Sequence, residues 1–231
     1  MDEIGRGFLE ALRMIASADA NLREIALRTV VVSGIATLFA MLAGVPLGYG
    51  LARGRFPGRT FLLSMVNTGM GMPPVVVGLV VWLMLVRSGP FGSFELVYTK
   101  EAMVIAQFLL ALPLVVGFTA ASVQSLPSQL PDLLASLGAG RVRTIWIVAR
   151  EARLGLLAAV MAGFGACISE IGASMQVGGN IQGDTRILTT AILTETSRGN
   201  TEQAIALGLV LLALAFTVNV ILTTVQQRRR A

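Results

Sequence analysis

The stretch PDLLASLGAGRVRTIWIVAREARLGLLAAV, residues 131–160, decides how this sequence is interpreted. It places four arginines among apolar residues and then leads into an uncharged run that begins at Leu154. Apolar positions recur at helical spacing on both sides of Gly138 and Gly140, and glycine readily takes the positive φ that a turn between helices requires. The stretch therefore predicts a helix–turn–helix hairpin joined to a long apolar helix.

The sequence on both sides of this hairpin is apolar. Hydrophobic residues make up 55% of the 231 residues and charged residues 13%, whereas soluble domains contain about 25% charged residues. Uncharged runs cover 29–52, 60–86, 102–131, 154–169 and 203–227. A span needs about 20 apolar residues. We therefore predict an all-α integral membrane protein with five membrane helices, at about 26–52, 61–86, 102–124, 154–178 and 203–226.

The residues before the first span have a different pattern. Ile4, Phe8, Leu9, Leu12 and Ile15 recur at helical spacing among charged residues, which predicts an amphipathic helix on the membrane surface. The expected organisation is an interfacial segment at 1–24, a transmembrane domain at 25–227 that includes the loop 125–153, and a basic tail at 228–231.

Basic residues mark one side of the membrane. On a five-span topology the segments 53–59, 125–153 and 227–231 share a side, and they hold most of the arginines that follow the N-terminal segment. The loops 87–101 and 179–202 hold two basic residues each. Because Lys and Arg favour cytoplasmic loops, we predict an external N-terminus and a cytoplasmic C-terminus. The net charge of +5 then reflects topology and does not indicate nucleic-acid binding.

The sequence lacks the parts of most enzyme sites. It contains one cysteine, Cys167, and no histidine, so a zinc site or a histidine-dependent triad has no ligands or base. It has no Gly-x4-Gly-Lys-Ser/Thr loop, and its only lysine is Lys100. We therefore expect no catalytic residue, no metal site and no cofactor in this chain. If ATP drives its function, another polypeptide must bind ATP and Mg.

The hairpin resembles the cytoplasmic loop of ABC-transporter permeases. That family's pattern is Glu-Ala-Ala, three residues, Gly, nine residues and Ile-x-Leu-Pro. Here Asp132 opens the first motif, Gly138 takes the glycine place and Val148 opens the last motif. From the residues alone, the arginines could face lipid phosphates or an acidic partner, or the loop could have no partner. The resemblance implies that the hairpin is a coupling helix that docks on an ATPase subunit. The residues expected to make this contact are Asp132, Ala135, Leu137, Gly138, Ala139, Arg141, Val148 and Glu151.

Two further stretches are similar to permeases for oxyanions, which carry tungstate, molybdate or sulfate. They are SEIGASMQVGGNIQGDTRILTTAI at 169–192 and the double-proline GMPPVVVGL at 71–79. The variants VGGNI, RILTTAI and ETSRGN resemble the tungstate-type branch most. The resemblance implies an importer that pairs with a second copy of itself, two ABC ATPase subunits and an extracytoplasmic binding protein in the plasma (inner) membrane of a prokaryote.

The predicted translocation path or gate involves residues near two possible helix breaks, and they are Pro73, Pro74, Ser169, Glu170, Gly172 and Ser174. The prolines interrupt the second span, either as a kink or as the start of a half-helix whose positive end favours an anion. Small residues of the fourth span either pack tightly within one subunit or face a path between two copies.

Glu170 is expected to be structural, because a bare carboxylate does not suit an anion path. It either pairs with a basic group such as Arg186 or accepts backbone hydrogen bonds near Gly172. The outer loop after 179, with a short helix at 187–195, is either passive or receives the binding protein through Asn180, Arg186 and Thr189.

Other classes of membrane protein fit less well. An ATP-independent secondary transporter or channel is the main alternative, but many such transporters show inverted repeats and this sequence shows none. An intramembrane enzyme lacks histidine and a cysteine pair.

Overall fold

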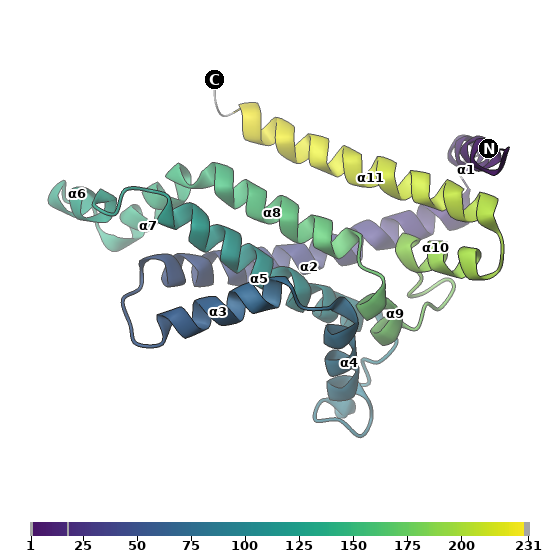
Figure 1. Cartoon of the computed structure of the whole chain (residues 1–231), viewed down its shortest axis with the longest axis horizontal. Coiled ribbons are helices and arrows are strands. Elements are labelled where there is room, and N and C mark those ends of the chain that lie inside the picture. The colour runs from purple at the N-terminus through teal and green to yellow at the C-terminus, as the bar shows by residue number, and fades with distance from the viewer. Residues whose placement is uncertain (1, 18, 229–231) are drawn as a thin grey trace.

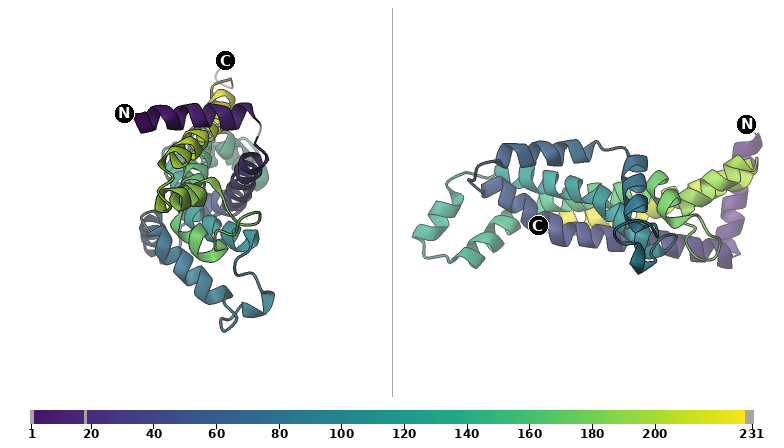
Figure 2. Two further views of the ribbon diagram at one scale, coloured as in Figure 1. Left: turned by 90° about the vertical axis from the view of Figure 1, so that its right-hand side faces the viewer. Right: turned by 90° about the horizontal axis from the view of Figure 1, so that it is seen from below.

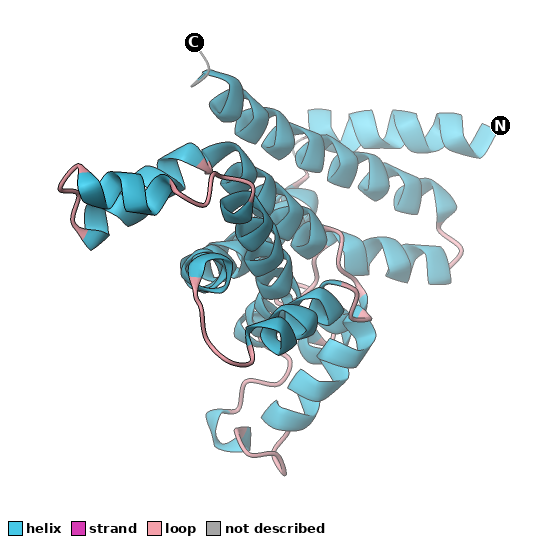
Figure 3. Ribbon diagram, turned by 60° about the vertical axis from the view of Figure 1, so that its left-hand side comes forward, coloured by secondary structure: helices cyan, strands magenta, loops and turns pink. Residues whose placement is uncertain are grey.

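The computed structural model describes residues 2–17 and 19–228, and within these ranges every regular element is helical (Figure 3). The helices are α1 Asp2–Ala16, α2 Ala20–Arg53, α3 Arg59–Met70, α4 Pro74–Leu85, η1 Gly92–Phe94, α5 Lys100–Gln124, α6 Leu130–Ser136, α7 Arg141–Glu151, α8 Arg153–Ile168, α9 Gly172–Gly178, α10 Leu188–Ser197 and α11 Thr201–Arg228. The all-α prediction is confirmed. Most of the predicted basic tail lies outside the described residues.

Three predicted spans are single long helices. These are α2, α5 and α11, each long and apolar enough to cross a membrane. They run along the long axis of the molecule (Figure 1). The helix α2 starts at Ala20, earlier than the sequence predicted, because Asp19 accepts a hydrogen bond from the Leu22 N–H and caps its first turn.

The other two predicted spans are broken. The interruption of the second span at its prolines was predicted, whereas the prediction of one helix over 154–178 is corrected. The second is divided into α3 and α4, which meet at 103°, and α4 lies across the long axis (Figure 1). The fourth ends as α8 at Ile168 and resumes as α9 at Gly172. A twelve-residue helix such as α3 is about 18 Å long, shorter than the hydrocarbon core of about 30 Å, so neither half of the second span crosses alone.

The centre of the bundle is packed through small residues. A Cβ added to Gly44 of α2 would lie 2.9 Å from Val115 Cγ1, and one added to Gly163 of α8 would lie 3.0 Å from Val115 Cγ2. Ala159 and Cys167 of α8 are also fully buried. Small side chains let α2, α5 and α8 approach closely in lipid. These three positions of α8 therefore pack within the chain.

The two ends of the molecule carry different segments. The α2–α3 loop and the α6–α7 hairpin lie at one end, toward which α11 also runs, and α1 lies at the other end (Figure 1). Seen along the long axis, α1 lies across the end of the bundle (Figure 2). Its Arg6 pairs with Glu202 at 3.0 Å, while Phe8, Leu9 and Leu12 are exposed. The surface helix predicted from the sequence therefore forms as α1, with an exposed apolar side.

Candidate functional site: two facing helix breaks and an exposed hairpin

The two helix breaks line one hollow. Its volume is about 380 Å³, and its walls come from both sides of the α3–α4 break, from α5, and from the segment that joins α8 to α9. The residues that line it are Gly69, Met70, Met72, Pro74, Val75, Leu110, Leu114, Ala166, Ser169, Glu170, Ile171 and Gly172. Breaks that are far apart in the sequence thus meet in space, as expected of a functional region within a membrane.

The first break follows from its two prolines. Pro73 has φ −61° and ψ 125° and caps α4, and Pro74 occupies the first helical position, where a missing N–H costs no hydrogen bond. The residue before a proline is also kept out of the helical region. The half-helix start that the sequence offered as one alternative is therefore observed.

The second break is capped by Glu170. Glu170 is 4% exposed. Its two carboxylate oxygens accept hydrogen bonds from the N–H groups of Ala173 at 2.6 Å and Ser174 at 2.8 Å. A carboxylate at the start of a helix satisfies free N–H groups and faces the positive end of the helix dipole. Of the two alternatives left open by the sequence, the structure shows the backbone hydrogen bonds and not the pair with Arg186.

The helix α9 is held from several directions. Gln107 of α5 donates from Nε2 to Ser174 Oγ at 3.0 Å, and Thr189 of α10 donates to the carbonyl oxygen of Glu170 at 2.9 Å. A Cβ on Gly78 of α4 would lie 2.6 Å from Ala173 Cα, so the two backbones are in direct contact. The half-helices α4 and α9 are thus packed as one unit.

The predicted path residues do not all reach the hollow. Pro74, Ser169, Glu170 and Gly172 line it. Ser174 is fully buried and does not line the hollow. Its hydroxyl oxygen accepts a hydrogen bond from Gln107. Pro73 is exposed beside it as the cap of α4.

The outer loop is held in place by Arg28, a residue that the sequence analysis did not select. Arg28 is 8% exposed and donates to the carbonyl oxygens of Arg186 at 2.8 Å and Gly183 at 2.9 Å while pairing with Glu24. The sequence does offer a sign of this role, because Glu24 and Arg28 are spaced four residues apart at the start of an apolar span. The loop 179–187 is therefore fixed to α2.

The three predicted docking residues differ in exposure. Asn180 accepts a hydrogen bond from Arg186 Nε at 3.2 Å and donates to Thr194 at 2.7 Å, and both Asn180 and Arg186 are partly exposed. Thr189 is 2% exposed and points inward to Glu170. Its position does not allow contact with an external partner in this structure, whereas Asn180 and Arg186 remain accessible.

The α6–α7 hairpin projects from the bundle at one end (Figure 1). Gly138 has φ +79° in the turn, a conformation that costs glycine little and other residues more. Leu137 is 75% exposed and Val142 83% exposed, which is unusual for large apolar side chains and is typical of an interaction surface.

Most predicted coupling residues lie on the accessible side of the hairpin. Asp132, Ala135, Gly138, Arg141 and Glu151 are exposed and Ala139 is partly exposed. Val148 differs, because it is fully buried in a cluster with Val123 of α5 and Ala152. Val148 therefore anchors the hairpin to the bundle and does not present its side chain to a partner.

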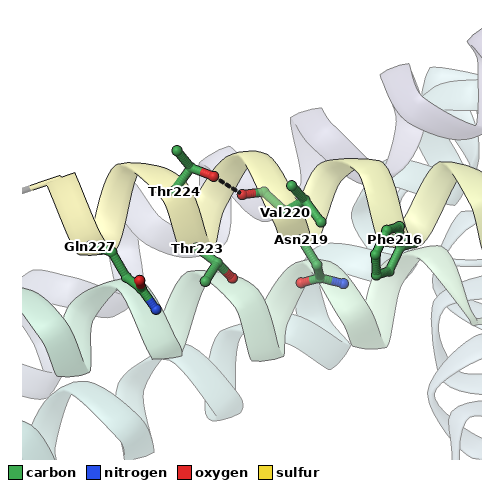
Figure 4. Close-up of a pocket in the computed structure, with 6 residues that line it drawn as sticks. All are labelled: Phe216, Asn219, Val220, Thr223, Thr224 and Gln227. Atoms are coloured by element: carbon green, nitrogen blue, oxygen red, sulfur yellow. Dashed lines mark hydrogen bonds between the residues drawn. The ribbon is translucent and has the colours of Figure 1, made fainter.

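A further surface hollow of about 550 Å³ runs along the last turns of α11. Asn219, Thr223 and Gln227 point to the same side of the helix there (Figure 4), and Thr224 donates to the carbonyl oxygen of Val220 at 2.7 Å. Polar side chains four residues apart on an apolar helix provide hydrogen-bonding groups for a neighbouring helix or for water.

The comparisons with known proteins agree along the chain. Residues 44–231 match the family described as "Binding-protein-dependent transport system inner membrane component". A probable anion ABC transporter permease protein of Haloferax volcanii is 44% identical over 214 residues, covering 89% of this chain and 92% of that protein. The tungstate uptake system permease protein TupB of Peptoclostridium acidaminophilum is 38% identical over 227 residues, covering 98% of this chain and 100% of that protein.

The fold also matches a solved structure. The inward-facing MetNI methionine ABC transporter has a chain that aligns with a TM-score of 0.69 at 15% identity, covering 90% of this chain and 95% of that chain. At this identity the likeness concerns the fold alone. Because the family model covers most of the sequence and two relatives match along nearly all of it, this chain belongs to the family of binding-protein-dependent transport system inner membrane components.

Proposed function

We propose that this chain is the permease subunit of an ATP-driven ABC importer for an oxyanion, with tungstate as the substrate. The exposed α6–α7 hairpin is the observation that carries the proposal, since it offers an exposed apolar surface that projects from the bundle (Figure 1). The substrate assignment is supported by a relative named for tungstate uptake that matches over the whole length of both proteins. A permease of this family is not itself an enzyme.

The hairpin acts as a lever on the bundle. Its α7 meets α8 at 70°, and the buried Val148 ties it to Val123 of α5 and to Ala152. A force applied to the hairpin by ATPase subunits therefore reaches α8, whose far end forms the wall of the hollow at Ser169. ATP and Mg are bound by the ATPase, and this chain transmits the movement.

The permease works as a pair. Every residue of α3 is described and none is buried. Of the most apolar stretch of α11, only 11% of the residues are buried within the chain. These surfaces leave room for a second copy as well as for lipid. Five helices are few to enclose a path, which supports a path formed between two copies.

The orientation is N-terminus outside and C-terminus in the cytoplasm, in the inner membrane of a prokaryote. The arginine-rich α2–α3 loop and α6–α7 hairpin lie at the same end of the molecule (Figure 1), which favours a cytoplasmic position for that end. The external binding protein then docks at the opposite end, where Asn180 and Arg186 are accessible.

Uptake measurements test this function. Cells lacking their own tungstate uptake are supplied with the chain, the ATPase and the binding protein, and cellular tungsten is measured by mass spectrometry. We expect accumulation only with all three components and an ATPase that hydrolyses ATP. Molybdate and sulfate in separate assays establish the preferred oxyanion. Equal accumulation with a hydrolysis-deficient ATPase would instead favour an ATP-independent transporter or channel.

A further inference from the structure

The helix α3 presents two exposed faces of opposite chemistry. One face carries Thr60, Ser64, Asn67 and Thr68, which we name the polar face, and all four side chains are exposed. The other carries Phe61 at 68%, Leu62 at 41% and Met65 at 56% exposure. The remaining side packs on α5, where a Cβ on Gly69 would lie 2.9 Å from Pro113 and one on Gly117 would lie 2.6 Å from Met70 Sδ.

Helical spacing places these two faces side by side on α3. Positions 64, 67 and 68 lie four, seven and eight residues after position 60, so at about 100° per residue the four polar positions span an arc of about 100°. Positions 61, 65 and 62 span the adjoining arc of about 100°, in which 61 lies nearest to the polar face and 62 farthest from it. An apolar side chain suits lipid, but a polar side chain facing lipid loses hydrogen bonds to water. The two exposed faces of α3 therefore meet different surroundings.

The hydrogen bonds within the polar face leave one group open. The hydroxyls of Ser64 and Thr68 donate to the carbonyl oxygens of Thr60 at 3.0 Å and Ser64 at 2.9 Å. Such hydroxyls can rotate to donate to another acceptor. The side-chain amide of Asn67 makes no hydrogen bond to any residue that the structure describes. Its NH₂ group is available to an external acceptor.

The helix α3 ends at the hollow between the two helix breaks, and the four residues of the polar face lie outside the lining of that hollow. The last residues of α3, Gly69 and Met70, form part of the wall of that hollow, together with Ser169. Glu170 in the same wall directs its carboxylate oxygens to backbone N–H groups. The charged side chain of α3 is Arg59 at its first position, and Arg59 donates to the carbonyl oxygens of Leu51 and Ala52.

We propose that the polar face of α3 lines the aqueous path of the transported oxyanion, and that Asn67 donates a hydrogen bond to the anion as it passes. This inference rests on the proposed function. Neutral donors suit a path, because an anion that meets a fixed positive charge is held tightly, whereas several weak sites let it enter and leave. The path then favours anions over cations through its hydrogen-bond donors, and no carboxylate along the polar face repels the anion.

Thiol accessibility tests the path without requiring that the substrate be known. Single cysteines replace Ser64 or Asn67 on the polar face and Phe61 or Met65 on the apolar face. Membrane vesicles of both orientations receive a membrane-impermeant, negatively charged methanethiosulfonate. The native Cys167 is fully buried, so the unmodified chain is the unlabelled control. We expect Ser64→Cys and Asn67→Cys to react at least tenfold faster than Phe61→Cys and Met65→Cys.

Equal reaction rates on the two faces, or no reaction at the polar face, would overturn the inference, because the polar face would then lie in lipid or against another helix. If Asn67→Cys fails to accumulate, Ser64→Cys and Thr68→Cys give the same readout with nearly isosteric changes.

A charge in the path gives a second test. We expect Asn67→Asp to reduce tungstate uptake more than tenfold while the complex still hydrolyses ATP, and Met65→Asn to retain at least half of the uptake. Undiminished uptake in Asn67→Asp would overturn the role of Asn67. If the unmodified complex takes up no tungstate but the labelling pattern holds, the substrate assignment fails and the path remains. If uptake is normal but the labelling pattern fails, the path is wrong and the importer remains.

Discussion

At the scale of single residues, Glu170 shows how a charge is accommodated within the membrane region. Its carboxylate accepts hydrogen bonds from the otherwise free N–H groups of Ala173 and Ser174. The hydroxyl of Thr189 donates to the carbonyl oxygen of Glu170. Helical rise could place Glu170 deep in the membrane, but the sequence could not choose its partner, because no proline marks the break between α8 and α9. The only local sign was Gly172.

Glu170→Gln is expected to lower stability without changing anion preference. Glutamine has one acceptor oxygen and no charge, so one hydrogen bond and the interaction with the helix dipole are lost, at about 1.5–3 kcal/mol. The melting temperature of the purified complex measures the loss. A changed ratio of tungstate to sulfate uptake, with an unchanged melting temperature, would show that Glu170 contacts the substrate.

Gly78→Ala tests the contact between α4 and α9. The new Cβ would lie 2.6 Å from Ala173 Cα, and overpacking of this kind costs about 1–3 kcal/mol. Gly34→Ala in α2 is the matched control, because a Cβ there meets nothing within 4 Å and alanine favours a helix. We expect a lower melting temperature for Gly78→Ala only. Equal melting temperatures would mean that the half-helices are not in close contact.

At the scale of elements, sequence patterns located helices better than they located their packing. The prolines at 73 and 74 predicted an interruption but left open whether it was a kink or a helix start, and the glycines predicted the turn of the hairpin. The assignment of Val148 to the partner surface rested on its motif position, and its 0% exposure could not be foreseen, because the sequence does not show which side of α7 faces α5. Arg28 was missed for a similar reason, since its carbonyl partners lie more than 150 residues away in the chain.

Gly138→Val tests the hairpin as a lever. Its φ of +79° is strained for a β-branched residue by roughly 1–3 kcal/mol, so the turn between α6 and α7 should rearrange while the spans still insert. We expect ATP hydrolysis to continue with tungstate uptake reduced at least fivefold. Gly140→Val is the control, because Gly140 has φ −68° and open space around it. Normal uptake in Gly138→Val would remove the turn from the mechanism.

At the scale of the whole molecule, the sequence predicted that the arginine-rich loops 53–59 and 125–153 share one end, as Figure 1 shows, but it did not predict the shape. The 103° bend between α3 and α4 depends on the contact of α4 with α9, which joins residues almost a hundred positions apart. Three helices of the described chain are long enough to span alone, and the count reaches five only if α3 with α4, and α7 with α8, are each counted as one bent span.

The topology can be measured with single cysteines on the two predicted sides of the membrane. In intact cells, an impermeant thiol reagent should label Phe94→Cys, which is 67% exposed in η1, and not Leu137→Cys, which is 75% exposed in the hairpin. In inside-out vesicles the pattern should reverse. Labelling of Leu137→Cys from outside the cell would invert the orientation.

The central claim is that the α6–α7 hairpin is the surface on which the ATPase docks. The most direct measurement attaches a photo-activatable cross-linker to Leu137→Cys in the assembled complex, with Phe94→Cys in η1, away from the hairpin, as the control. We expect a covalent adduct between the ATPase subunit and residue 137 and none with residue 94. An adduct from residue 94, or no adduct from residue 137 in a complex that still transports, would contradict it.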